Sequence, residues 1–80
     1  MDWSVIVGAN VRRLRKERGL TQEEVALSAH TDLRYLGSIE RGKANPSVLL
    51  LGRLAEVLDV HPSVLFGSTD VPARPSDLDD

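Results

Sequence analysis

The side chains best suited to recognising another molecule lie on one face of a short predicted helix, residues 32–41, which Asp32 can cap. Leu36 and Ile39 recur at i and i+3 and are assigned to the core, so the opposite positions face outward. A guanidinium on such a face can donate two hydrogen bonds to the O6 and N7 atoms of guanine, and a leucine can contact the methyl group of thymine. The positions expected to face outward are Leu33, Arg34, Gly37 and Ser38. We expect all of these but the glycine to contact base edges.

A second set of side chains has the types needed to hold phosphate groups. Gln22 stands at the start of a preceding helix, where unpaired N–H groups and the helix dipole favour an anion. Tyr35 has a hydroxyl at the border of the outward face, and the loop after residue 41 offers further donors. Contacts of this kind position a protein on DNA without reading its sequence. The residues expected at the DNA backbone are the donors Gln22, Tyr35, Arg41, Lys43 and Asn45, together with Asp32, whose charge would repel wrongly placed phosphates.

The elements that must position these side chains are all helical. Apolar residues recur with helical spacing, and no strand-like alternation of any length occurs. Val7, Val11 and Leu14 form an apolar stripe on the first expected helix, and Val25, Ala26 and Ala29 turn inward on the second. Thr21 and Glu24 fit a capping box, and Pro62 suits the first turn of a last short helix. The expected helices cover residues 4–18, 21–29, 32–41, 47–58 and 62–66, and the expected N-caps are Ser4, Thr21, Asp32 and Ser47. The sequence therefore predicts an all-α, compact five-helix domain.

The composition changes after Gly67. Residues 68–80 carry four aspartates against one arginine and have almost nothing to bury, so we expect a disordered acidic tail. Residues 1–67 form the single expected domain, in which nine basic residues face eight acidic ones, a formal charge of +1. The whole chain has a formal charge of −2. A near-neutral domain with local basic faces can bind DNA, although its non-specific affinity should be weak.

The composition also excludes several classes of protein. Without cysteine, a disulfide scaffold, a thiol redox centre and a Cys-based zinc site are excluded. The two histidines, His30 and His61, are far apart in the sequence, which argues against a metal site. No apolar run approaches the roughly 18 residues needed to span a bilayer. No nucleophile–base pair, carboxylate pair or phosphate-binding glycine loop is present, so we expect no enzyme activity. We expect a cytoplasmic protein without metal, other cofactor, small-molecule ligand or membrane association.

Three stretches carry a resemblance to a known family: Leu-Thr-Gln-Glu-Glu-Val-Ala at 20–26, Tyr-Leu-Gly-Ser-Ile-Glu-Arg-Gly at 35–42, and Asn-Pro-Ser at 45–47. They resemble the Cro/repressor (XRE-type) helix-turn-helix family, over roughly residues 7–66. The last two stretches are also similar to the small controller proteins of restriction–modification systems. The resemblance implies a lambda-repressor-like fold, a phosphate contact for Gln22 and an internal ion pair between Arg15 and Glu40. His30 stands where the family usually has Gly in the motif turn, and histidine tolerates the left-handed conformation required there.

These observations predict a sequence-specific transcriptional regulator that binds a (pseudo)palindromic operator in double-stranded DNA as a homodimer. The similarity to controller proteins implies, more narrowly, a restriction–modification controller protein. We assign the apolar stripe of residues 47–58 to the core. The apolar residues of 60–66 are too many for one short helix to turn inward, and the resemblance places the two-fold interface there. The residues expected at the dimer interface are His61, Pro62, Val64 and Phe66. The alternative is an antitoxin-like or other protein-binding module in which DNA binding is secondary.

Overall fold

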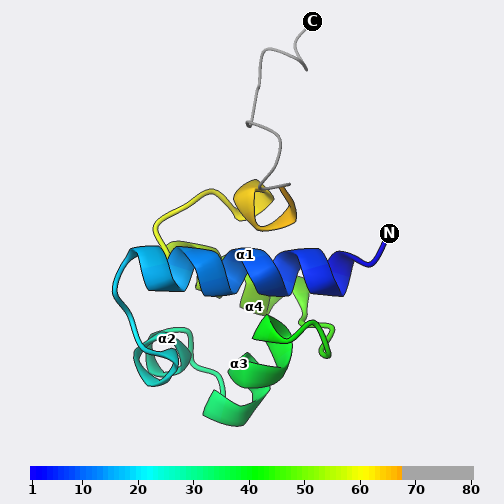
Figure 1. The fold of residues 1–80 in the computed structure, drawn as a ribbon. Coiled ribbons are helices and arrows are strands. Elements are labelled where there is room, and N and C mark those ends of the chain that lie inside the picture. The colour runs from blue at the N-terminus through cyan, green and yellow to red at the C-terminus, as the bar shows by residue number, and fades with distance from the viewer. Residues whose placement is uncertain (68–80) are drawn as a thin grey trace, which may run out of the picture.

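The computed structural model describes residues 1–67, which form four α-helices and a short 3₁₀-helix. In chain order the elements are α1 (Trp3–Glu17), α2 (Gln22–Ser28), α3 (Leu33–Glu40), α4 (Val48–Val57) and η1 (Pro62–Phe66). Figure 1 shows α1 crossing the middle of the molecule, with α2 and α3 on one side, η1 on the other and α4 behind it. Across residues 1–67, no helix has the length and apolarity needed to cross a membrane.

The predicted all-helical architecture is confirmed, but the fifth element is not an α-helix. η1 contains five residues and begins at a proline, after His61, whose ring nitrogen accepts the N–H of Ser63 at 3.1 Å. Such a short segment closes with the tighter i→i+3 bonds of a 3₁₀-helix, as Val64 N–H does to the carbonyl of His61. The predicted acidic tail, residues 68–80, lies outside the described residues.

Side-chain caps define where the α-helices begin. Three of the predicted N-caps are confirmed, and they are Thr21, Asp32 and Ser47. The fourth prediction, Ser4, is wrong, because the carboxylate of Asp2 accepts the N–H groups of Ser4 at 3.0 Å and of Val5 at 3.4 Å. A carboxylate also interacts favourably with the positive end of the helix dipole, so α1 begins earlier than predicted.

One apolar cluster fills the space enclosed by the helices. Burial of each large aliphatic side chain in it stabilises the folded state by about 1.5–3 kcal/mol. The stripe predicted on α1 is part of it, and so are the inward positions predicted on α2, α3 and α4. The cluster consists of Val7, Val11, Leu14, Val25, Ala26, Ala29, Leu36, Ile39, Leu50, Leu54, Ala55, Leu58 and Leu65.

A backbone contact brings α1 against the C-terminal end of α3. Gly8 is buried, and a Cβ atom added to it would overlap the backbone carbonyl oxygen of Ile39. On the same side, Gly42 has φ +75°, and a Cβ there would lie 3.0 Å from the Cα of Val5. Glycine at both positions lets α1 approach the C-terminal end of α3 closely, and this contact fixes the position of that end relative to α1.

A buried amide joins the last element to α1. The Nδ2 atom of Asn10 donates to the carbonyl oxygens of Leu65 at 2.8 Å and Gly67 at 2.7 Å. Asn10 lies between Val7 and Val11 on the apolar stripe, where a polar side chain needs partners to offset its lost hydration. Both amide N–H groups are used, and η1 is held against the middle of α1.

Replacing Gly8 by alanine should therefore destabilise the domain. The overlapped atom belongs to the backbone and cannot move aside easily, so we expect a loss of at least about 1–3 kcal/mol. The matched control is Gly37→Ala on α3, where an added Cβ meets only Nη1 of Arg41 at 3.2 Å, the end of a flexible side chain that can move aside. Alanine there should be neutral or stabilise by up to about 1 kcal/mol, because it favours helix over glycine. Thermal unfolding measures both, and equal Tm values for the two variants would contradict the close approach.

Candidate nucleic-acid interface

α2 and α3 are joined by a short turn in which His30 has φ +58°. The predicted left-handed conformation is thus confirmed, and histidine adopts it more readily than a β-branched residue would. The N–H of Thr31 then bonds to the carbonyl of Ala26 at 2.9 Å, which closes the end of α2. Asp32 starts α3 directly after the turn, and its carboxylate accepts the N–H of Arg34 at 3.4 Å. The two helices form a helix-turn-helix arrangement.

The outer face of α3 begins with the side chains expected to read bases. Leu33 and Arg34 are both exposed, and Tyr35 lies at the border of the face as predicted. Ser38 is half-buried, and its hydroxyl accepts a hydrogen bond from Nη2 of Arg41 at 3.3 Å. The exposed part of the face is therefore concentrated in the first turn of α3.

The prediction that Gly37 faces outward is wrong, because Gly37 is buried. A Cβ added to it would lie 3.2 Å from Nη1 of Arg41, so the arginine side chain lies over this position. The spacing of residues along α3 does not show this, since the cover comes from the side chain of the helix C-cap.

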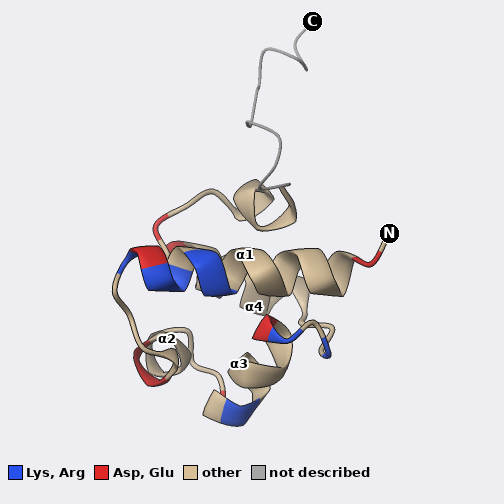
Figure 2. Cartoon of the chain, in the orientation of Figure 1, with Lys and Arg blue, Asp and Glu red and all other residues tan. Residues whose placement is uncertain are grey.

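The loop after α3 carries the remaining predicted backbone contacts, and Arg41, Lys43 and Asn45 are all exposed. Figure 2 shows basic positions in the first turn of α3, in this loop and along the C-terminal half of α1. Asn45 also lines a small pocket with Trp3 and Phe66, at the other end of α1. Asn45 therefore lies beside residues of the N-terminal half of α1.

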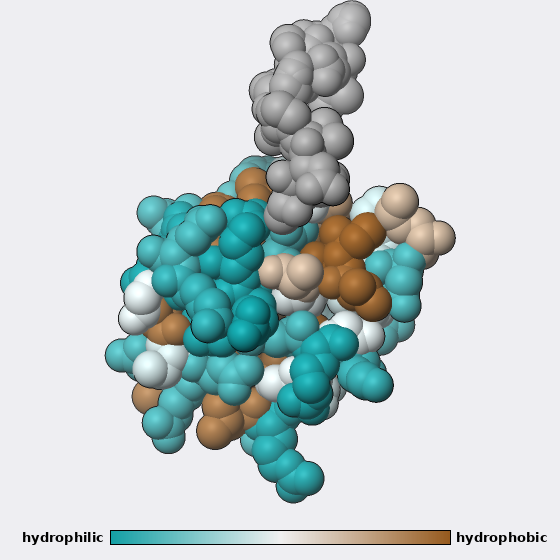
Figure 3. All heavy atoms as spheres, in the orientation of Figure 1, coloured by the Kyte–Doolittle hydropathy of each residue, from teal (hydrophilic) through white to brown (hydrophobic). Residues whose placement is uncertain are grey.

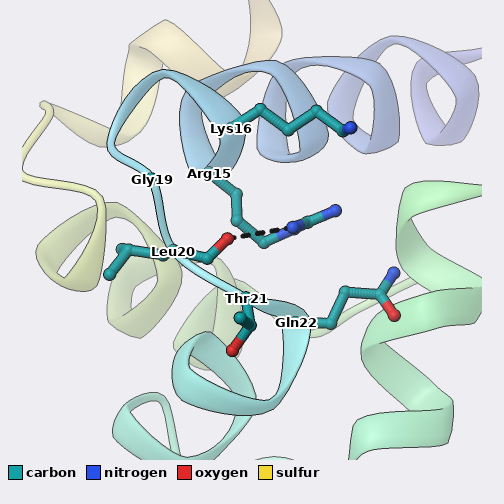
Figure 4. Close-up of a pocket in the computed structure, with 6 residues that line it drawn as sticks. All are labelled: Arg15, Lys16, Gly19, Leu20, Thr21 and Gln22. Carbon is teal, nitrogen blue, oxygen red and sulfur yellow. Dashed lines mark hydrogen bonds between the residues drawn. The ribbon is translucent and has the colours of Figure 1, made fainter.

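A buried ion pair joins α1 to the end of α3. Arg15 donates from Nε to Oε2 of Glu40 at 2.7 Å and from Nη2 to Oε1 at 3.0 Å, and the two side chains are only 11% and 2% exposed. The third guanidinium nitrogen, Nη1, donates to the carbonyl of Leu20 at 3.0 Å, the bond drawn in Figure 4. Hydrogen bonding to Glu40 raises the pKa of Arg15 above its ordinary value; burial opposes this and the charge of Glu40 adds to it. The internal pair that the resemblance implied is present.

Gln22 contacts this ion pair. Its Nε2 atom donates to Oε1 of Glu40 at 3.0 Å, and the residue is half-buried. The sequence assigned Gln22 to phosphate binding alone, because its acceptor stands 18 positions away in the chain. Figure 4 shows that Gln22 and Lys16 line the same shallow groove between α1 and α2. Lys16 was not among the predicted contacts, although it lies in the basic segment of α1.

The residues predicted at a dimer interface separate into two places. Pro62 is exposed and borders a shallow groove with Val48, Leu49 and other residues of α4. Phe66 instead packs edge-on against Trp3, with the ring centres 5.9 Å apart, beside the N-terminal half of α1 where Figure 3 shows an apolar patch. His61 caps η1 and is exposed, whereas Val64 is half-buried and packs against the core.

The predicted apolar stripe of α4 lies in the core, but α4 also carries apolar residues outside that stripe. Leu50, Leu54 and Ala55 are buried as expected, but Val48 is 84% exposed and Leu49 is 66% exposed. A run of four apolar residues from Val48 to Leu51 covers every side of the helix, so part of it must face outward. That run is the signal by which this surface could have been found.

Comparison with known proteins gives consistent matches over this region. The family described as "Helix-turn-helix" matches residues 11–65. The chain is 47% identical over 70 residues to the uncharacterized HTH-type transcriptional regulator y4dJ of Sinorhizobium fredii, covering 88% of this chain and 91% of that protein. It is 35% identical over 75 residues to the HTH-type transcriptional regulator SinR of Bacillus licheniformis, covering 92% of this chain and 68% of that protein. The crystal structure of the restriction-modification controller protein C.AhdI from Aeromonas hydrophila superposes with a TM-score of 0.76 at 40% identity, over 79% of this chain and 96% of that one.

Removing either partner of the buried ion pair should destabilise the protein in the absence of DNA. Arg15→Ala or Glu40→Ala leaves the other charge buried without its partner, which destabilises by about 3–5 kcal/mol. The control is Glu17→Ala, which breaks a pair with Arg13 of 3.1 Å whose side chains are 38% (Arg13) and 53% (Glu17) exposed. Exposed pairs contribute at most about 1 kcal/mol, so this variant should melt close to the parent. If Arg15→Ala and Glu40→Ala also melt like the parent, the structural role of the pair is wrong.

Proposed function

We propose that this chain, a member of the XRE-type helix-turn-helix family of transcriptional regulators, binds a specific operator in double-stranded DNA as a homodimer. The observation that carries the proposal is the exposed first turn of α3, capped by Asp32 and displaying Leu33 and Arg34 beside the basic loop. Binding to genomic DNA places its site of action in the cytoplasm. A narrower proposal, a restriction–modification controller protein, is supported by the 40% identity with nearly all of C.AhdI.

In this proposal α3 enters the major groove with its N-terminal turn foremost. Arg34 donates from its guanidinium to O6 and N7 of one guanine, and Leu33 contacts a thymine methyl group. Ser38 lies one helical turn after Arg34 and contacts a base edge only where the floor of the major groove is closest to α3. Because few base contacts are available from one helix, each half-site is short and weak by itself.

Phosphate contacts hold α3 in register. The donors are the amide of Gln22, the hydroxyl of Tyr35 and the exposed groups of the following loop, and Asp32 caps α3 by accepting the backbone N–H of Arg34. The described domain has a formal charge of only +1, so bulk attraction to DNA is small. Specificity therefore depends on base contacts and on the two-fold repetition of the site.

The groove beside α4 is the surface we assign to the second subunit. Val48 and Leu49 are its most exposed apolar side chains, and Gly52 leaves open space between them and Pro62. Contiguous exposed apolar surface of this kind marks association sites. A two-fold axis there repeats α3 on the second subunit, and such pairs read half-sites about 34 Å apart, one turn of DNA. This assignment keeps Pro62 from the sequence prediction and replaces Val64 and Phe66 by residues of α4.

The direct test is selection of bound sequences from random duplex DNA at a stated salt concentration. The proposal expects an inverted repeat whose half-sites are centred one helical turn apart, with a guanine at the position of Arg34. Recovery of unrelated sequences, with a partner protein co-purifying in the absence of DNA, favours a protein-binding module instead.

Arg34→Ala should weaken binding to the selected operator by about 1–3 kcal/mol and relax the preference at one base pair in each half-site. The matched variant is Lys43→Ala, which removes an equal charge from the loop. Lys43→Ala should weaken binding to operator and to random DNA alike. It should also reduce the slope of log affinity against log salt concentration by about 1. Repeating the selection with both variants separates the two roles. An unchanged base preference in Arg34→Ala would exclude it as a reading residue.

Leu49→Glu should yield a folded monomer with reduced operator affinity, because a charge in an apolar interface opposes association. The control is Leu27→Glu, a leucine that is 78% exposed on α2 and lies outside the α4 groove. Sedimentation at micromolar concentration measures the association state, and helical circular dichroism confirms folding. A parent protein that sediments as a monomer and still binds its operator tightly as a single copy would refute the dimer.

A further inference from the structure

We propose that Glu40 is a positioning residue for DNA binding: it holds the side-chain amide of Gln22 in one orientation, with a single Nε2–H directed at the DNA backbone. The inference rests on the proposed function and adds to it a residue that touches no DNA. It assigns Glu40 two simultaneous tasks, pairing with Arg15 and orienting Gln22.

The hydrogen bonds of the Glu40 carboxylate leave one orientation for Gln22. Oε2 accepts Nε of Arg15, and Oε1 accepts both Nη2 of Arg15 and Nε2 of Gln22 at 3.0 Å. An ionised carboxylate only accepts hydrogen bonds, so the amide must present its nitrogen and not its oxygen. Glu40 is 2% exposed, and water cannot easily take the place of Gln22 at this oxygen.

The bond to Glu40 leaves half of the donor capacity of Gln22 available. A primary amide nitrogen carries two N–H groups, and the bond to Oε1 uses one of them. Gln22 is half-buried at the wall of the groove that Lys16 also lines, where Figure 4 shows its amide extended away from the backbone of α2. A donor that is already held in place loses less conformational entropy when it binds a phosphate oxygen.

The contact also joins the two parts of the interface. Gln22 is the first residue of α2, and Glu40 is the last residue of α3. The end of α3 is fixed independently by the backbone contact between Gly8 and Ile39. A phosphate bound by Gln22 is therefore held at a fixed position relative to the first turn of α3, which is proposed to read bases. The contacts to the DNA backbone thus determine which base pairs that turn reaches.

The first test uses the parent protein. In an isotope-labelled sample, the two side-chain amide protons of Gln22, assigned by their loss in Gln22→Ala, should differ. One should exchange slowly and shift little with temperature, because it is bonded to Glu40. A short random-sequence duplex at low salt should shift the other proton and leave the bonded one in place. Two equivalent, freely exchanging protons, or loss of the bonded signal on DNA binding, would overturn the proposal.

The second test is a double-mutant cycle on affinity for the same random duplex. Gln22→Ala should weaken binding about tenfold, the size of one hydrogen bond to a charged group. Glu40→Gln should weaken it by a similar factor, and the double variant should be no weaker than Gln22→Ala, because Glu40 acts through Gln22. The matched control is Glu17→Gln, the same charge change in an exposed pair, which should not weaken binding. Independent, multiplicative losses would overturn the positioning role.

The two tests separate failure of this inference from failure of the proposed function. A parent that binds neither random nor selected DNA overturns the proposed function, and the bonded proton of Gln22 is then only structural. A parent that binds DNA while both Gln22 protons stay unperturbed overturns the inference alone. If Glu40→Gln does not fold, the titration of the parent decides the question without it.

Discussion

The buried pair of Arg15 and Glu40 is the interaction on which the arrangement of this domain depends. Removing two charges from water is costly, and the cost is recovered only when every remaining donor and acceptor is satisfied. Here the third nitrogen of the Arg15 guanidinium donates to the carbonyl of Leu20, and the Glu40 carboxylate accepts a further N–H from Gln22. One ion pair thereby ties together α1, the link to α2, the start of α2 and the end of α3.

α1 supports both functional ends of the molecule by contacts of different kinds. Near its middle, Gly8 allows backbone to meet backbone at the end of α3, and Asn10 holds the carbonyl oxygens at the end of η1. The turn of α3 proposed to read bases and the α4–η1 surface proposed for the second subunit are therefore both placed relative to one helix. Two recognition helices can act together only if that placement is rigid, since half-site spacing is set by geometry.

The near-neutral charge of the described domain suits a regulator that depends on sequence and symmetry. Binding driven by many phosphate contacts would be strong but indiscriminate. In the proposed mode of binding, a single exposed turn carrying Arg34 and Leu33 on a domain of near-neutral net charge gives weak single-site binding and leaves discrimination to paired half-sites. An apolar α4 surface that couples two subunits would then contribute as much to recognition as the base contacts do.

The sequence by itself determined the features that depend on neighbours within a turn or two of helix: the all-helical class, the caps Thr21, Asp32 and Ser47, and the apolar stripe of α1. A resemblance, not spacing, supplied the left-handed turn at His30 and the pairing of Arg15 with Glu40. The tertiary structure alone decided that Gln22 bonds to Glu40, that Arg41 covers Gly37, that Asn10 clamps η1 and that Val64 packs inward. The apolar run of residues 48–51 implies that part of α4 faces outward, but only the packing decided that Val48 and Leu49 are the exposed part. The physical reason is that each of these depends on the distance between residues on different elements or on how much of a helix its neighbours cover. A periodicity states which residues share a face, but only packing determines what that face meets.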